Sequence, residues 1–436
     1  MTDTPLFRFF TEGLERKADL HFRVHQALMI GLAFLFPFAQ FLLPLFAILL
    51  GINAFLYGLL ASDRLGTAYR AKKERVLPFL LTGFFLLYLV GTAYTDHFSE
   101  ALFDLQKKIG FLFFPLLFLF MPAMKEKEGK RVLFAFVLGC CVAAILGFIQ
   151  ALVNFYGHSD HHLQYLYGGY FAFEVHRGYL AIYFLFGASA ALWLINNKRK
   201  GDPWIGRKQL LVPAFLLVLV ALFMTASRSS ILVLPVLVLL IVFRDIKGSW
   251  RFRWGLLGIL FAALIALLIL FPKNYQRLKE SYRTVVEVAS GKGVEEVETG
   301  KMRLKVWSVG SGIFLDHWLK GMGTGDDDKA LEKKYRGQGW DMGEFRGMDV
   351  HCQYLQTGIA LGIPGILLLV GILFRTLLVG YRSNLLLLVM GTVLLVTAFF
   401  ESVLERQAGI LFFACFLPFM AVGWNYGKEE EAHEVG

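Results

Sequence analysis

Long apolar runs, separated by short polar and basic segments, make up most of this chain. A helix needs about 20 mostly apolar residues to cross the hydrocarbon core of a bilayer. Pro37 and Pro44 divide the first long run into two such segments. The pattern therefore predicts an all-α polytopic membrane protein with about twelve transmembrane helices, at 26–40, 43–60, 76–94, 109–122, 131–155, 177–196, 209–226, 229–243, 253–271, 354–379, 384–400 and 408–426.

The segment between the ninth and tenth predicted spans is too long to be a simple connection. Residues 272–350 form a loop of 79 residues, and long ordered loops are usually functional. Helix-like patterns occupy parts of it, at 274–288, 301–315 and 326–335. The predicted organisation is therefore transmembrane helices 1–9 (1–271), a partly helical loop domain (272–350), transmembrane helices 10–12 (351–426) and a polar tail (427–436).

Composition supports a membrane protein, because 56% of the residues are hydrophobic and only 18% are charged, against about 25% charged in soluble domains. The net charge of +10 must be assigned to sides of the membrane before it is interpreted, so it does not indicate nucleic acid. With the N-terminus inside, the predicted inner segments hold 25 of the 44 Lys and Arg, the short outer loops five and the long loop 14. Because basic residues concentrate on the cytoplasmic side and long loops are exempt, both termini are predicted to be cytoplasmic and the long loop extracytoplasmic.

Basic residues stand at the outer ends of the predicted spans six and eight. Arg228, within the segment 225–230, begins a helix, where the helix dipole disfavours a cation. This placement is reasonable if an anion binds between the guanidinium, the free N–H groups and the serine hydroxyls. His176 and Arg177 begin the sixth span and could hold a phosphate or a sugar in the same way. The alternative at both places is an interfacial side chain that reaches to lipid headgroups.

The second helical stretch of the long loop carries another candidate. Met302, Val306 and Val309 recur at helical spacing as an apolar stripe, and Arg303 and Trp307 lie on a neighbouring face. The Trp307 ring could stack on a sugar. The alternative is an amphipathic helix that lies on the membrane surface.

His351 stands where the long loop re-enters the membrane. An imidazole titrates near neutral pH and suits a general base for a hydroxyl acceptor, although a hydrogen-bonded boundary residue is the alternative.

The side of the membrane restricts the kind of donor, because an extracytoplasmic site has no ATP. A bond-forming reaction there needs a donor that arrives already activated, and a lipid-linked diphosphate is the obvious kind.

Two other patterns do not support a cofactor or a metal. The glycine-rich segment 321–325 resembles a phosphate loop, but no Lys-Ser/Thr follows it, so a turn is predicted, with Asp326 capping the next helix. Capping is also taken to explain the acidic run 326–328. His158, Asp160, His161 and His162 cluster in one outer loop without the spacing of a rigid metal site.

Taken together, these motifs resemble the O-antigen ligase and O-antigen polymerase superfamily over about residues 170–375. The match is in order and topology, and its blocks are Ser227-Arg228-Ser229, Arg303-Leu304-x-x-Trp307, the segment 316–325, His351-x-x-Tyr354-Leu355-Gln356 and Gly362-Ile363-Pro364-Gly365. The family often has Asn after the histidine of the fourth block and Pro after that of the third, where this chain has Cys352 and Trp318.

The resemblance implies a membrane glycosyltransferase of the bacterial inner membrane that works without a metal or cofactor at the periplasmic face. It would move a glycan from undecaprenyl diphosphate to a lipid A–core acceptor. A polysaccharide polymerase, whose acceptor is another lipid-linked glycan, and a lipid or glycan transporter are the alternatives. The implied roles are general base for His351, diphosphate binding for Arg228, Arg303 and Arg177, and acceptor or sugar contact for Trp307, Tyr354 and His176.

Overall fold

The computed structural model describes residues 5–159, 162–197, 208–245, 248–290, 301–340 and 342–425. Their regular structure is helical, and the one β-type pairing found among them is an isolated bridge between Met124 and Trp424. The helices are α1 Pro5–Leu35, α2 Leu43–Leu60, α3 Ser62–Ala71, α4 Val76–Gly91, α5 Phe98–Lys108, α6 Gly110–Phe120, α7 Glu126–Gly157, α8 Arg177–Asn196, α9 Lys208–Met224, α10 Arg228–Asp245, α11 Trp250–Leu270, α12 Pro272–Ala289, α13 Lys301–Asp316, α14 Asp327–Gly337, α15 Met342–Phe345, α16 Gln353–Ser383, α17 Leu385–Phe400 and α18 Gln407–Pro418.

Each of the twelve predicted spans overlaps one of these helices. Six helical segments in the described part of the chain are long and apolar enough to cross a membrane: Gln40–Leu60, Val76–Tyr94, Glu126–Gly157, Arg177–Asn196, Trp250–Leu270 and Gln353–Ser383. Lys208–Met224, Leu385–Phe400 and Gln407–Gly423 are shorter apolar helices. The chain is thus a multi-pass membrane protein, and the count of twelve crossings stays a prediction.

The fourth predicted span, 109–122, corresponds to a helix that is too short to cross a bilayer alone. Helix α6 has 11 residues and is about 16 Å long at 1.5 Å per residue, against a hydrocarbon core of about 30 Å. It ends at Phe120 because Met121 takes an extended conformation before Pro122.

Aromatic rings from four parts of the chain pack together in the interior of the helical bundle. Phe36, Phe136, Tyr183 and Phe416 are all fully buried. The ring of Phe416 on α18 lies 5.6 Å from that of Phe36 and 5.2 Å from that of Phe136 on α7. Each such pair adds about 0.5–1.5 kcal/mol to the burial of its apolar area. These contacts fix α18, and with it the loop that precedes α18, against α7 and α8.

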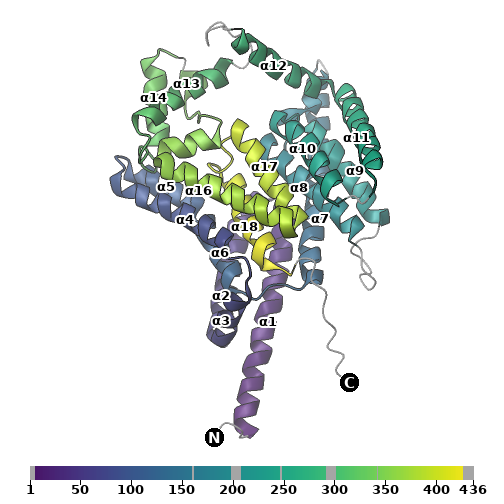
Figure 1. Cartoon of the computed structure of the whole chain (residues 1–436), viewed down its shortest axis with the longest axis vertical. Helices are drawn as coiled ribbons and strands as arrows, with labels where there is room; N and C mark the ends of the chain where they lie inside the picture. Colours follow the sequence, from purple (N-terminus) through teal and green to yellow (C-terminus); the bar gives the residue numbers. More distant parts are fainter. Residues whose placement is uncertain are drawn as a thin grey trace.

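Helices α12, α13 and α14 lie at one end of the molecule, and α3 and the start of α1 lie at the other (Figure 1). Helices α12, α13 and α14 confirm the three helical stretches predicted within 272–350. Val306 and Val309 of the predicted stripe are buried in a small core with residues of α14 and α16, whereas Met302 is 37% exposed. The apolar face of α13 therefore packs against protein, and the alternative of a helix lying on the membrane is not needed to explain it.

The glycine-rich segment 321–325 is a turn, as predicted, and it docks on a kink in α16. Gly321, Gly323 and Gly325 have φ of 73°, 109° and 87°, and Gly362 within α16 has φ of 65°. The Met322 N–H donates to the carbonyl of Ile359 at 2.8 Å. A Cβ on Gly362 would lie 2.7 Å from the backbone nitrogen of Gly321. This close approach ties the loop domain to the helix that follows His351.

The prediction that Asp326 caps α14 is wrong. Its carboxylate makes no hydrogen bond at the start of that helix. It accepts instead from the Thr95 hydroxyl at 2.8 Å and from the N–H of Asp96 and His97 at 2.9 and 3.0 Å. The segment between α4 and α5 offers free N–H donors, and they outcompete the helix end. Asp327 is buried and accepts from the Gln356 amide at 2.8 Å, so capping does not explain the acidic run either.

Candidate functional site

Two cavities of about 210 and 180 Å³ lie side by side where α8, α10, α12 and α13 meet the connection between α17 and α18. They share His176, Arg177, Arg303 and Glu401 in their walls. Five of the seven residues predicted for the site line one or both cavities, and these five are His176, Arg177, Arg228, Arg303 and His351. Segments far apart in the sequence are thus brought together at the helix ends that the sequence had singled out.

The other two predicted residues, Trp307 and Tyr354, do not line either cavity. Trp307 packs at the edge of the small core between α13 and α16. The Tyr354 hydroxyl donates to the carbonyl of Leu395 at 2.9 Å, and its ring lies 4.6 Å from that of Phe399. Both side chains hold helices together in this structure, and their contact with a sugar stays a prediction.

The first cavity is strongly cationic, because four guanidinium groups line it, from Arg177, Arg228, Arg277 and Arg303. Arg277 on α12 was not identified in the sequence. It is one of 14 basic residues in the long loop, and no motif distinguishes it from the others. Its place in the cavity comes from the packing of α12 against α10 and α11.

Among the described residues, two of these arginines form ion pairs and two do not. Arg228 lies 2.5 Å from the Glu280 carboxylate, and Arg303 lies 3.4 Å from that of Glu401. In the described part of the chain, neither Arg177 nor Arg277 has a carboxylate within ion-pair distance. Like charges confined in a small cavity repel one another, so this arrangement favours an anion between them.

The surroundings of Arg277 strengthen this interpretation. Its Nε is buried and has no hydrogen-bond acceptor among the described residues. Burial, together with the nearby charges of Arg177 and Arg228, lowers the pKa of Arg277 to about 10. Gly168, with φ of 68°, lies beside both guanidinium groups: a Cβ there would be tight against Arg177 Nη1 at 3.3 Å and in ordinary contact with Arg277 Nη2 at 3.9 Å. Buried donors without acceptors are costly unless a ligand satisfies them.

His351 lies in the second cavity and is held by two carboxylates. Its Nδ1 lies 3.1 Å from Asp349 Oδ1 and 3.6 Å from Glu401 Oε2. Hydrogen bonds to Asp349 and Glu401 raise the pKa of His351 to about 9, although burial opposes the shift. Because Nδ1 is engaged, Nε2 is the ring nitrogen that remains for a substrate.

Asp349 is the partner that orients His351. Its Oδ1 accepts from the His351 backbone N–H at 2.7 Å and from the Ser402 hydroxyl at 3.1 Å. Burial raises the pKa of Asp349, but the hydrogen bonds from His351 and Ser402 outweigh it and lower the pKa below its usual value. Asp349 is therefore a carboxylate that favours the protonated imidazole.

Glu401 connects the two cavities, because its Oε1 faces Arg303 and its Oε2 faces His351. Glu401 was not among the residues predicted for the site, although it is a carboxylate directly after the apolar run 385–400. An acidic residue at the end of a predicted span was a usable signal for a functional position.

Backbone strain is concentrated beside the same cavities. Among the described residues, the non-glycine residues with positive φ are Glu174 at 53°, Ala226 at 48° and His351 at 49°. Glu174 precedes His176 by two positions, and Ala226 precedes Arg228 by two. Such conformations cost about 1–3 kcal/mol each and tend to persist at functional sites.

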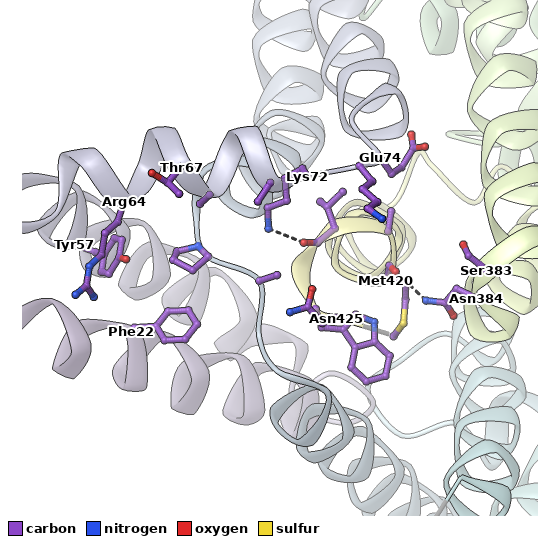
Figure 2. Close-up of a pocket in the computed structure, with 18 of the residues that line it drawn as sticks. Phe22, Tyr57, Arg64, Thr67, Lys72, Glu74, Ser383, Asn384, Met420 and Asn425 are labelled. Atoms are coloured by element: carbon purple, nitrogen blue, oxygen red, sulfur yellow. Dashed lines mark hydrogen bonds between the residues drawn. The ribbon is translucent and has the colours of Figure 1, made fainter. Parts of the chain in front are cut away.

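A larger cavity, of about 850 Å³, lies elsewhere (Figure 2). Its walls include Tyr57, Arg64 and Lys72 near α3, and Met420 and Trp424 after α18. The Lys72 ammonium donates to the carbonyl of Val422 at 2.7 Å. The residues predicted for the site do not line this cavity, so volume alone does not mark the place where the candidate chemistry gathers.

The described residues contain no group of three His, Cys, Asp or Glu side chains placed to hold a metal ion. Of the four residues weighed as metal ligands in the 158–162 segment, Asp160 and His161 lie outside the described ranges. The charged groups that line the two cavities are arginine, histidine and carboxylate side chains.

Comparison with known families identifies the segment that carries most of this site. Residues 213–370 match a family model described as O-antigen ligase. The matched segment includes Arg228, Arg277, Arg303 and His351, whereas Arg177 and Glu401 lie outside it. No curated protein matches the chain significantly.

Proposed function

Because residues 213–370 match a family model described as O-antigen ligase, we propose that the protein is a membrane glycosyltransferase. It transfers a glycan from undecaprenyl diphosphate to a hydroxyl group of a lipid A–core acceptor. The observation that carries this proposal is the meeting of four arginines and His351 in two adjoining cavities. A cationic cavity beside an oriented imidazole suits a reaction that releases a diphosphate and deprotonates an alcohol.

In this proposal the cationic cavity binds the diphosphate of the donor. Arg177 and Arg277, which have no ion-pair carboxylate among the described residues, make the first contact with the phosphate oxygens. Guanidinium groups bind phosphates through two parallel hydrogen bonds and remain charged when buried. They neutralise the charge that develops on the leaving group, so the reaction does not depend on a divalent metal.

His351 acts as the general base on the acceptor. The acceptor oxygen attacks the anomeric carbon of the donor glycan, and its proton passes to Nε2 of His351. The bond between that carbon and the diphosphate oxygen breaks, and the diphosphate leaves with the electron pair. Since the pKa of His351 is raised to about 9, the imidazole must lose its resting proton before it can accept another, and the rate should depend on pH.

Glu401 links the donor-binding group Arg303 to the general base His351. It touches Arg303 on the donor side and His351 on the acceptor side. Its charge offsets part of the cationic cavity, so the donor is bound without being held too tightly to leave. The proposed site lies on the periplasmic face of the inner membrane, with both termini in the cytoplasm, following the distribution of basic residues.

A deletion strain complemented with the gene tests this function. A ligase predicts that long glycan disappears from lipid A while the lipid-linked polymer accumulates, and that the wild-type gene, but not one encoding His351→Ala, restores it. Single-repeat caps on lipid A would instead indicate a polymerase, which uses the same chemistry on another lipid-linked acceptor. Normal surface glycan and normal lipid-linked intermediates in the deletion strain would contradict both.

A further inference from the structure

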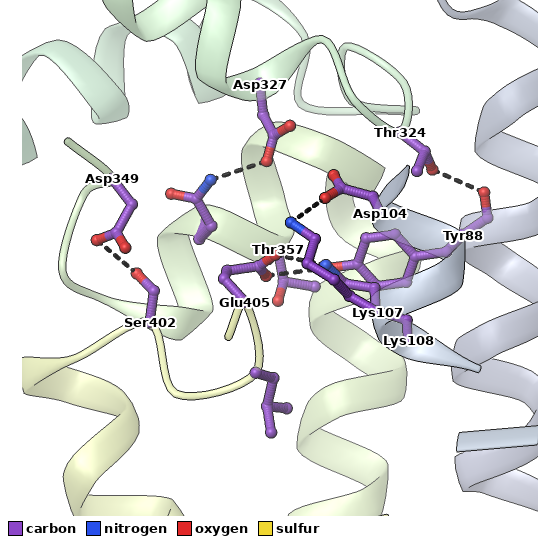
Figure 3. Close-up of polar contacts among 12 residues, drawn as sticks. Tyr88, Asp104, Lys107, Lys108, Thr324, Asp327, Asp349, Thr357, Ser402 and Glu405 are labelled. Carbon is purple, nitrogen blue, oxygen red and sulfur yellow. Dashed lines mark hydrogen bonds and ion pairs between the residues drawn. The ribbon is translucent and has the colours of Figure 1, made fainter. Parts of the chain in front are cut away.

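The connection between α17 and α18, residues 401–406, carries three residues that line the His351 cavity: Glu401, Ser402 and Arg406. We call this segment the 401–406 loop. Its position relative to His351 decides whether Glu401 and Ser402 can make their contacts. Figure 3 shows polar side chains of the loop and of its surroundings, which come from α4, α5, α14, α16 and the segments that precede α14 and α16.

A buried ion pair holds one side of the 401–406 loop. Lys108, at the end of α5, has a fully buried side chain, and its Nζ lies 2.5 Å from Glu405 Oε2. The same ammonium lies 4.5 Å from the centre of the Tyr88 ring. A buried ammonium is costly unless it is paired in good geometry, so this contact strongly restricts where Glu405 can be.

Gln353, the first residue of α16, holds the same loop from the other side. Its Nε2 donates to Glu405 Oε1 at 2.9 Å, and its Oε1 accepts from the Leu404 backbone N–H at 2.6 Å. The side chain is fully buried and stands two positions after His351. It therefore joins the loop directly to the segment that carries the histidine.

We propose that Lys108, Gln353 and Glu405 are positioning residues, which hold the 401–406 loop so that Glu401 and Asp349 orient His351 for transfer. None of the three lines the cavities. They act through the loop, because Glu405 fixes it at one end while Ser402 donates to Asp349 at 3.1 Å at the other. The role in transfer rests on the proposed function, but the effect on His351 itself does not.

The charges around His351 determine what loosening the loop does. Asp349 on its own segment and Glu401 on the loop favour the protonated imidazole. The other groups that face the cavity are mostly basic. They are His176 just before α8, Arg177 and Tyr179 on α8, Arg303 on α13 and Arg406 on the loop, with Cys352 next in the chain. When the carboxylates separate from the ring, these cations dominate, and His351 loses its proton at lower pH.

The test is to titrate His351 in the full-length protein in detergent micelles, using ¹⁵N-labelled histidine with His351→Ala to assign the signal. The wild-type protein should titrate with a pKa of about 9. Lys108→Met and Gln353→Met should both lower this value towards the ordinary 6.5. Measured above pH 9, where the imidazole is neutral in the wild type and in both variants, kcat should also fall by about 10²-fold, since a small misplacement of a reacting group costs that much, with little change in KM for the lipid-linked donor.

Lys107→Met is the matched control, because Lys107 pairs with Asp104 on its own helix and not with the loop. It should leave the His351 titration and kcat unchanged. If Lys108→Met does not insert, Gln353→Met alone carries the test. A correctly inserted Lys108→Met or Gln353→Met protein whose His351 titrates as in the wild type would overturn the proposal. A wild-type protein that transfers no glycan would instead overturn the proposed function and leave the titration result standing.

Discussion

His351 lies within 3.6 Å of two carboxylates, and these contacts affect both the orientation and the protonation of its ring. They present Nε2 to the cavity, which a base requires. They also stabilise the imidazolium, which a base must first give up. Because the pKa of His351 is raised to about 9, its protonated form stabilises the fold fully below its ordinary value of 6.5. That stabilisation is lost as the pH rises through about 9.

The pH dependence of transfer follows from this protonation. The neutral imidazole is a minor form at pH 7, and its fraction rises roughly tenfold per pH unit until the pH approaches the pKa. We expect kcat to rise between pH 7 and about 9 and then to level off. His351→Gln should lower kcat by about 10²–10⁴-fold and remove this dependence. Steady-state rates at matched membrane levels check both, and a flat profile for the wild type would exclude His351 as the base.

The arginines should affect donor binding more than the acceptor step. Arg277→Gln removes a hydrogen-bonding cation worth about 1.5–3 kcal/mol, so we expect KM for the lipid-linked donor to rise by about 10- to 100-fold. Arg277→Lys should recover only part of the loss, because an ammonium cannot make the same two-point contact. Arg283→Gln, an exposed position on the same helix, is the control. Equal donor affinity in Arg277→Gln and Arg283→Gln would remove Arg277 from the donor site.

Several site residues have an identifiable signal in the sequence, and others do not. Five basic residues fall in the predicted short outer loops, against the general bias, and three of them, Arg177, Arg228 and Arg406, line the cavities. A cation in an unusual place is thus informative. Arg277 has no such contrast, since it stands among many basic residues of an amphipathic helix. Its role depends on where α12 packs.

At the scale of helices, apolar periodicity predicts the elements well, and helices α12, α13 and α14 match their predicted stretches closely. It fails where tertiary contacts decide the outcome. Asp326 binds the segment between α4 and α5 instead of its own helix. Helix α1 begins at Pro5, well before its apolar run. Neither the docking of the 321–325 turn nor the contacts of Lys108 and Gln353 with the 401–406 loop can be predicted from local spacing, since both join segments distant in sequence.

The contact between the 321–325 turn and the α16 kink is testable through its glycines. In Gly362→Ala the new Cβ would lie 2.7 Å from Gly321 N, and the alanine would have to adopt a φ of 65°. Gly347 has φ of 64° with nothing within 4 Å, so Gly347→Ala shares the strain without the clash. We expect Gly362→Ala to be less stable than Gly347→Ala by about 1–3 kcal/mol, with a lower Tm in detergent. Equal Tm values would show that the close packing contributes nothing.

At the scale of the whole molecule, the candidate site and the cavity of about 850 Å³ belong to different parts of the chain. The site lies where α12 and α13 meet the ends of α8, α10 and α17. The cavity of about 850 Å³ is formed near α3 and the residues that follow α18. Figure 1 places α12–α14 and α3 at opposite ends of the molecule. This separation agrees with the predicted topology, in which the site lies on one face of the membrane and the basic loops lie on the opposite face.

Cysteine labelling tests this orientation. In a chain whose natural cysteines are replaced by alanine, Lys333→Cys on α14 and Lys73→Cys after α3 are both exposed positions. A maleimide that cannot cross membranes should label Lys333→Cys in intact spheroplasts and Lys73→Cys only after permeabilisation. Labelling of Lys73→Cys, but not Lys333→Cys, in intact spheroplasts would reverse the topology.

The central claim, that His351 and the surrounding arginines transfer a glycan from a lipid diphosphate, is tested most directly with purified components. The full-length protein is mixed in detergent with an undecaprenyl-diphosphate-linked glycan and lipid A–core, and the product is followed by gel and mass spectrometry. We predict glycan-bearing lipid A that forms equally well in EDTA, and almost none with His351→Ala or Arg277→Gln under limiting donor. No product from the wild type, or wild-type yield from His351→Ala, would contradict the account.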